Sequence, residues 1–264
     1  MLALVAALAL AAPWVPAVQT AQHGAVRVQL SYEQQSVDPS GDFKIYRHVR
    51  VRVERGGALV FDREICKQVC GPAPGGAIAF RNVWGTRSPE VVVSLYTGGA
   101  HCCFQTEFVL LRPHGRATGV FHDWGDLGYR GQWLRGRYWL VTGDDRFAYA
   151  YTSFAGSAFP MQVWTLDRPG RLVDVTRQRL DLVAANAKRL WKTYLAYRGK
   201  DDIRGVLAPW CADEYLLGER AACNGELDRA VARGWLRTDD LGPGGRAYVA
   251  KVHRDLARWG YSRA

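Results

Sequence analysis

A histidine followed at once by two cysteines is the part of this sequence whose residue types could do chemistry most directly. Residues 97–103 read Thr-Gly-Gly-Ala-His-Cys-Cys. A thiolate next to an imidazole could bind a soft metal such as copper or zinc, or serve as an activated nucleophile. Adjacent residues on a strand point to opposite faces, however, so His101 and Cys102 are poorly placed to bind the same ion. The segment therefore favours disulfide formation, with a metal site and a catalytic thiol as the weaker alternatives.

The cysteines form an even set, which is typical of disulfides in an exported protein. We expect all of them to be in disulfides: Cys66, Cys70, Cys102, Cys103, Cys211 and Cys223. The first two are expected to pair with the middle two, although the spacing leaves the exact partners open.

The last two cysteines flank a predicted turn between helices. Cys211 and Cys223 stand at equal distances in sequence on either side of Leu217, which is followed by Gly218. Glycine readily takes the left-handed conformation that ends a helix. Two helical arms of equal length about such a break would face each other, and a disulfide could join them. We therefore expect a Cys211–Cys223 bridge across a helical hairpin.

Histidine and aspartate side chains are the remaining candidates for a functional site. We name His101, His122, Asp144 and Asp145 as the possible site, because an enzyme would need at least two convergent titratable groups. The sequence contains no G-x-S-x-G, H-E-x-x-H, Walker A or G-x-G-x-x-G motif. We therefore assign no catalytic residue, no metal ligand and no cofactor. Whether the chain is an enzyme stays open, with a non-catalytic role favoured.

The charge of the chain points to the class of partner. The net charge is +10, and such a basic surface favours anionic partners. The basic residues are scattered along the chain, which argues against nucleic acid. An anionic cell-surface polymer or a carbohydrate is the class of partner that we expect, and its identity is unknown.

The N-terminus has the composition of an export signal. Residues 1–12 are an uncharged run rich in leucine and alanine, which ends at Pro13. This length is typical of the hydrophobic region of a signal peptide and is too short to span a bilayer. We predict a signal peptide over residues 1–21, cut between Ala17 and Ala21, and secretion to the extracellular space or the periplasm. No later apolar run is long enough for a membrane span.

The spacing of the apolar residues changes along the chain. From Ala25 to about Thr176 they alternate in short runs separated by glycine, proline and aspartate, which predicts antiparallel strands such as residues 49–54 and 58–61. From Asp181 onward they recur at the helical period, which predicts four helices.

Caps and a proline mark the predicted helices. Asp181 should cap the first helix, and Asp201 and Asp202 should cap the second, which Pro209 should kink or split. The succession of strands and then helices predicts an α+β fold. We expect an antiparallel β-repeat domain over residues 22–180, propeller-like or built of stacked β-meanders, and a C-terminal helical segment over residues 181–264.

A family resemblance adds to this prediction. Residues 89–103, which read Pro-Glu-Val-Val-Val-Ser-Leu-Tyr-Thr-Gly-Gly-Ala-His-Cys-Cys, resemble a segment of uncharacterised secreted bacterial proteins, and these look similar to FG-GAP and VCBS-type β-propeller repeats. The likeness covers most of the chain from about Ala77. It implies an extracellular, repeat-like β domain with a helical appendix, and it implies no particular activity.

The chain departs from these repeats at their calcium loops. Such loops need several carboxylates. At the corresponding places, residues 81–88 and 132–137, this chain has arginines and no carboxylate. We therefore expect no calcium there.

These observations lead to one main hypothesis and two alternatives. The main hypothesis is an exported, non-catalytic binding or structural β-repeat protein of unknown ligand. The first alternative is a hydrolase that acts on the cell wall or on polysaccharide. The second is a copper- or zinc-binding protein that uses His101, Cys102 and Cys103.

Overall fold

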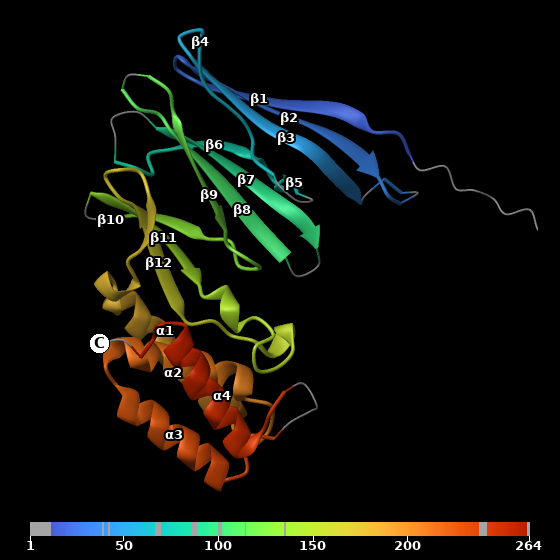
Figure 1. Cartoon of the computed structure of the whole chain (residues 1–264). Coiled ribbons are helices and arrows are strands. Elements are labelled where there is room, and N and C mark those ends of the chain that lie inside the picture. The colour runs from blue at the N-terminus through green and yellow to red at the C-terminus, as the bar shows by residue number, and fades with distance from the viewer. Residues whose placement is uncertain are drawn as a thin grey trace, which may run out of the picture. The chain divides into compact units, whose positions relative to one another are not determined.

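The computed structural model of the chain is mostly antiparallel β-sheet, with four helices late in the sequence (Figure 1). It describes residues 12–38, 40–41, 43–66, 70–85, 89–99, 102–113, 115–134, 136–237 and 242–262. Contacts between residues divide the chain into two compact units. The N-terminal unit comprises the described residues up to Asn82 and from Pro89 to Asp123, and the C-terminal unit comprises Val83–Gly85 and the chain from Trp124 onward.

Two antiparallel sheets make up the N-terminal unit. The first has the order β1-β2-β3-β4, with bounds Val15–His23, Val26–Ser36, Lys44–Arg55 and Ala58–Glu64. The second has the order β5-β7-β8-β9, with β6 also paired to β7, and the bounds of β5 to β9 are Gly71–Pro72, Ile78–Arg81, Glu90–Gly99, Cys102–Leu110 and Thr118–Asp123.

Alternating valines explain why these strands form. Val51 and Val53 of β3 and Val91 and Val93 of β7 have no exposed surface and belong to one hydrophobic core. Every second residue of each strand thus faces the core that the two sheets share. The antiparallel part of the predicted fold is confirmed. The described strands form open sheets, and the propeller form stays a prediction.

One carboxylate is buried within this core. The Glu107 side chain has no exposed surface, and its carboxylate accepts hydrogen bonds from Arg63 Nη2 of β4 at 2.5 and 2.7 Å. Burial raises the pKa of Glu107, although the charge of Arg63 and its hydrogen bond oppose the rise. The pair joins β8 of one sheet to β4 of the other.

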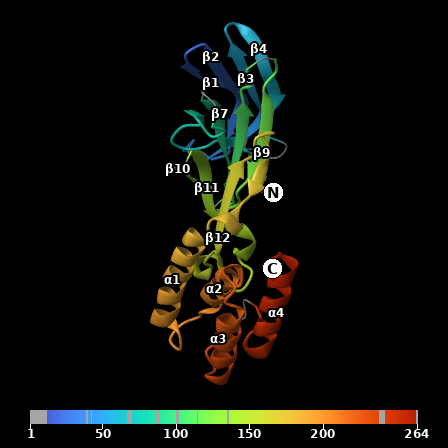
Figure 2. The same cartoon turned by 90° about the vertical axis from the view of Figure 1, so that its left-hand side faces the viewer.

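The C-terminal unit combines the third sheet with all of the helices. This sheet has the order β10-β11-β12-β13, with bounds Arg130–Leu134, Arg137–Gly143, Met161–Leu166 and Leu172–Asp174. Three short 3-10 helices, η1 to η3, span Asp145–Phe147, Phe154–Gly156 and Thr176–Gln178. The helices α1 to α4 span Leu180–Tyr197, Arg204–Leu217, Arg220–Ala232 and Gly245–Arg258, and Figure 2 shows them lying side by side.

Contacts between residues place the sheet β10–β13 in the same unit as the helices. The expected division at residue 180 instead separates the strands from the helices. Val163 of β12 and Val175 are buried in a cluster against which Leu182 of α1 packs. The change from strands to helices does occur at Leu180. Alternation and helical period, which guided the prediction, carry no information about which sheet packs on which helix.

Pro209 lies within α2, which continues through it as one helix. A proline inside a helix lacks the N–H that would bond the carbonyl of the residue four positions earlier. In this protein that carbonyl belongs to Gly205, and it accepts the backbone N–H of Ala158 at 2.8 Å instead. A loop donor thus replaces the missing helical bond, and the expected split does not occur.

Two disulfides are described. Cys66 and Cys70 are joined to each other, with Cα atoms 6.1 Å apart. The expected links from these two residues to Cys102 and Cys103 are therefore wrong, because the short loop between β4 and β5 already brings its two ends within bridging distance. Cys103 is also disulfide-bonded, and its partner lies outside the described side chains.

The second disulfide joins Cys211 of α2 to Cys223 of α3, with Cα atoms 5.0 Å apart. Gly218 lies between the two helices with a φ of 87°, the left-handed conformation expected of it. Both cysteines are fully buried. The structure thus contains the bridge that the equal helical arms indicated.

The end of the predicted signal peptide overlaps a strand. Val15–His23 form β1, which pairs with β2 from Val15 opposite Gln34 to His23 opposite Val26. Residues 1–11 lie outside the described part of the chain. The proposed cut between Ala17 and Ala21 would fall inside this paired strand.

Candidate functional site

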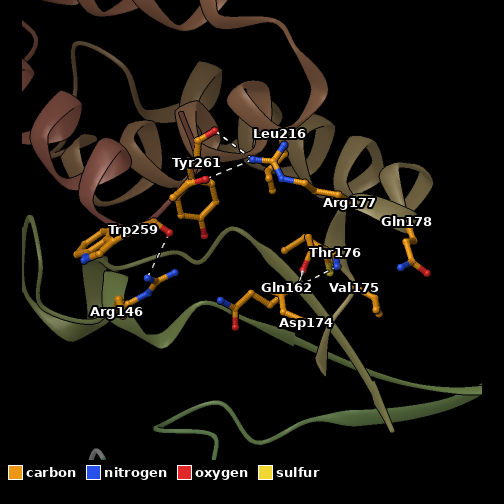
Figure 3. Close-up of a pocket in the computed structure, with 12 residues that line it drawn as sticks. Arg146, Gln162, Asp174, Val175, Thr176, Arg177, Gln178, Leu216, Trp259 and Tyr261 are labelled. Atoms are coloured by element: carbon orange, nitrogen blue, oxygen red, sulfur yellow. Dashed lines mark hydrogen bonds between the residues drawn. The ribbon is translucent and has the colours of Figure 1, made fainter. Parts of the chain in front are cut away.

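The C-terminal unit contains a cavity of about 370 Å³ that both polar and apolar side chains line (Figure 3). We call it the tail cavity, because the tail of the chain after α4 lines it. Its described lining residues are Arg146, Met161, Gln162, Asp174, Val175, Thr176, Arg177, Gln178, Leu216, Trp259, Gly260 and Tyr261.

Several segments distant in sequence supply these side chains. Arg146 comes from η1, Gln162 from the start of β12, and Asp174 from the end of β13. The segment that follows β13 and forms η3 adds Arg177. Trp259 directly follows the last residue of α4. Only the folded C-terminal unit brings these groups together.

Asp144 is not a described lining residue of the cavity, but it holds the guanidinium of Arg146 in place. Its Oδ1 and Oδ2 accept hydrogen bonds from Arg146 Nε at 2.8 and 3.0 Å, and Oδ2 also accepts the Tyr261 hydroxyl at 2.7 Å. Burial alone would lower the pKa of Arg146, but the hydrogen bond and charge of Asp144 raise it on balance. Burial, together with Asp144, raises the pKa of Tyr261, which therefore stays a donor. Asp144 is thus a positioning group.

The two arginines of the cavity also hold the tail of the chain. Arg146 Nη1 donates to the carbonyl of Trp259 at 3.4 Å. Arg177 Nη2 donates to the carbonyls of Gly260 and Tyr261 at 3.3 and 3.4 Å, as the dashed lines in Figure 3 show. Both arginines thus tie the tail of the chain to the wall of the cavity.

Asp174 is held in one orientation by the turn that follows it. Its Oδ1 accepts the backbone N–H of Thr176 at 2.8 Å and the Thr176 hydroxyl at 2.6 Å. The same hydroxyl oxygen accepts the N–H of Val163 at 2.9 Å. Asp174 is exposed and is the one acidic residue among the described lining residues.

The side chains that line the tail cavity are suited to binding a ligand. Guanidinium groups donate charge-assisted hydrogen bonds to anions, the amides of Gln162 and Gln178 both donate and accept, and Asp174 accepts. The half-buried ring of Trp259 adds an apolar surface. Hydrolysis of a glycosidic bond generally needs a pair of carboxyl groups, and the described lining supplies one.

Two of the residues named from the sequence as a possible site, Asp144 and Asp145, belong to the C-terminal unit, and neither is among the described lining residues of the tail cavity. Asp144 supports the tail cavity without lining it, and Asp145 Oδ1 accepts the backbone N–H of Asp126 at 3.0 Å. His122 belongs to β9 of the N-terminal unit, and burial lowers its pKa. His101 lies outside the described residues, so the proposed metal site at His101, Cys102 and Cys103 is not described.

Among the described residues, no group of three or more His, Cys, Asp or Glu side chains is placed to hold a metal ion. In the same residues, no helix is both long enough and apolar enough to cross a membrane.

The lining residues of the tail cavity were missed from the sequence. Arg146 stands two positions after Asp144, but an Asp-x-Arg triplet is too common to indicate a site. Gln162, Asp174 and Trp259 have no spacing that relates them. Their proximity depends on how β12, β13 and the tail pack, and a single sequence carries no signal for that.

Comparison with known proteins finds one partial relative. The chain is 34% identical over 143 residues to a probable thylakoid lumen protein of Synechocystis sp., and the match covers 50% of this chain and 40% of the relative. The chain thus matches about two fifths of the relative's length. No family model matches the chain. No solved structure matches it either.

Proposed function

We propose that the chain is an exported, non-catalytic binding protein whose tail cavity takes an acidic carbohydrate. The observation that carries this proposal is the combination of two guanidinium groups, two side-chain amides, one carboxylate and a tryptophan ring around a single cavity of about 370 Å³. That volume lies within the range of roughly 300–1,000 Å³ typical of small-molecule sites.

Each group in the cavity matches a part of such a ligand. Arg146 and Arg177 would donate to the ligand's carboxylate. The amides and Asp174 would bond its hydroxyl groups, which both donate and accept. The apolar face of the sugar ring would pack on Trp259. The basic net charge of +10 would favour the approach of a polyanionic chain.

Two observations support export. The relative that matches this chain is described as a probable thylakoid lumen protein. The two described disulfides are typical of oxidising compartments outside the cytosol. The resemblance to FG-GAP and VCBS-type repeats is part of the same proposal, and the four-stranded antiparallel sheet β10–β13 has the strand number of a propeller blade.

The proposal can be tested by calorimetric titration with tetragalacturonate, and with maltotetraose as a neutral saccharide of the same length. We expect saturable binding of tetragalacturonate and weaker binding of maltotetraose. Arg177→Gln should weaken binding of the acidic saccharide roughly tenfold, the loss expected for a charge-assisted hydrogen bond. Gln162→Ala should weaken both saccharides.

The matched control is Arg233→Gln, which removes an exposed arginine that lines no described cavity. It should bind both saccharides like the wild type, and all variants should keep their circular dichroism spectra. Equal affinity for the acidic and the neutral saccharide, or an equal loss in both arginine variants, would show that the tail cavity does not recognise an acidic carbohydrate.

A further inference from the structure

The C-terminal unit has a second cavity, of about 430 Å³, whose described lining shares Met161 alone with that of the tail cavity. We call it the basic cavity. Its described lining residues are Leu127, Gly128, Tyr129, Arg130, Val141, Thr142, Gly143, Phe159, Pro160, Met161, Asn186 and Arg189. Arginines supply its charge, and no aspartate or glutamate is among these described residues. Much of the remaining wall is apolar.

A chain of buried polar groups fixes one of the arginines. Nε and Nη2 of Arg189 donate to Asn186 Oδ1 at 3.2 and 2.8 Å. Asn186 is 7% exposed, and its Nδ2 donates to the carbonyl of Phe159 at 3.1 Å and to Asp213 Oδ2 at 2.6 Å. Asp213 Oδ1 in turn accepts the N–H of Met161 at 2.9 Å. The guanidinium is therefore held in place before any ligand binds, which lowers the entropic cost of binding.

The second arginine is positioned by the sheet. Arg130 is the first residue of β10 and lies opposite Val141 of β11. The Thr142 hydroxyl donates to the carbonyl of Gly128 at 2.6 Å, which fastens the loop before β10 to β11. Arg130 and Arg189 therefore reach one cavity from the sheet and from α1 respectively.

Asp213 is the acidic group to which this chain of hydrogen bonds leads. Burial raises the pKa of Asp213 to about 7, while Arg189 opposes the rise and Glu214 adds to it. Near neutral pH a share of the Asp213 carboxyl groups is thus uncharged. The positive charge of Arg189 remains available to a ligand.

We propose that the basic cavity is a second binding site, for a small amphipathic anion whose charged group is held by Arg130 and Arg189 and whose apolar part packs on the apolar wall. The cavity's charge and its apolar lining argue together for this class. A free inorganic anion would leave the wall formed by residues such as Leu127 and Phe159 unused, and a neutral apolar ligand would form no charge-assisted hydrogen bond with the two guanidinium groups. The proposal does not rest on the function proposed for the tail cavity, with which the basic cavity shares the lining residue Met161.

The test uses octanesulfonate, which stays ionised over the accessible pH range, and compares it with octanol and methanesulfonate. Octanol has the apolar chain without the charge, and methanesulfonate has the charged group without the chain. In calorimetric titrations of the full chain we expect saturable binding of octanesulfonate and weaker binding of the other two. Arg130→Gln and Arg189→Gln should each weaken octanesulfonate roughly tenfold.

Control variants separate this site from the tail cavity and from general charge effects. Arg177→Gln alters the tail cavity and should leave octanesulfonate binding unchanged, as should Arg233→Gln, at the exposed residue that follows α3. Arg189→Lys keeps the charge and should retain part of the affinity. The proposal is overturned if octanesulfonate does not saturate, if octanol binds equally well, or if Arg130→Gln and Arg189→Gln bind like the wild type.

Discussion

Asp213 is a carboxyl group without exposed surface, bonded to the Met161 N–H and to the Asn186 amide. Burial raises its pKa from 3.8 to about 7. The folded protein therefore binds this proton more tightly than the unfolded chain, so the contribution of Asp213 to stability is fully present below about pH 4 and is lost as the pH rises to about 7. This difference between the unfolded and folded pKa of Asp213 corresponds to at most roughly 4 kcal/mol of folding free energy.

Asp213→Asn should remove that pH dependence. The free energy of unfolding of both proteins is measured by urea denaturation between about pH 4 and pH 8. In the difference between the two proteins, the contributions of the other titrating groups cancel. We expect the wild type to lose stability relative to Asp213→Asn as the pH rises through this range. A difference that stays constant would show that Asp213 keeps an ordinary pKa in the folded protein.

At the scale of single residues, the sequence indicated candidates without their roles. Asp144 was named as a possible reacting group, and its bonds to Arg146 and Tyr261 instead make it a support for the tail cavity. Titratable residue types are visible in a sequence, whereas the partners that use up their lone pairs are not. Arg146 and Arg189 were overlooked because arginine is abundant in this chain and its role depends on where it is packed.

Elements were more predictable than sites, because burial of one face imposes a period on the sequence. The alternating valines of β3 and the helical spacing of Val183, Ala187 and Leu190 in α1 both correspond to buried positions. Helix caps were harder to predict. Asp181 lies in the first turn of α1, where it pairs with Arg179, and does not serve as the cap.

The disulfide between α2 and α3 is expected to stabilise the helical part of the C-terminal unit. Cys211 and Cys223 are 12 positions apart. A bridge that closes a loop of this size contributes about 3 kcal/mol by restricting the unfolded chain. Replacing both cysteines with alanine should lower the free energy of unfolding by about that amount, measured by chemical denaturation under oxidising conditions.

A reductant supplies the matched control for this prediction. It should destabilise the wild type and leave the double variant less affected, since the variant lacks this bridge. Ligand binding at the tail cavity should persist in the double variant, because neither cysteine lines it. A double variant that unfolds at the wild-type denaturant concentration would mean that the bridge adds nothing to stability.

On the scale of the whole molecule, the strand content did not reveal how the chain divides. The sheet β10–β13 belongs with the helices, since its apolar face packs against α1. Both cavities follow from that division, because each lies within the C-terminal unit and Met161 of β12 lines both. A division of the sequence by predicted element type assigns β12 to a β domain, although β12 belongs to the same unit as the helices.

The pairing of β1 with β2 bears on where the mature protein begins. A cut after Ala17 would remove the start of β1, and a cut after Ala21 would leave only Gln22 and His23 of that strand. Either cut would expose backbone groups of β2 that β1 now covers along its length.

We therefore expect the folded protein to retain the whole of β1. Mass spectrometry of the protein secreted from a bacterial host should find an N-terminus at or before Val15. A recombinant chain that starts at Ala12 should also melt at a higher temperature than one that starts at Gln22, because only the longer chain retains the full β1–β2 pairing. A secreted protein that begins between Val18 and Gln22, or equal melting temperatures of the two chains, would show that β1 is dispensable and that the cut lies within it.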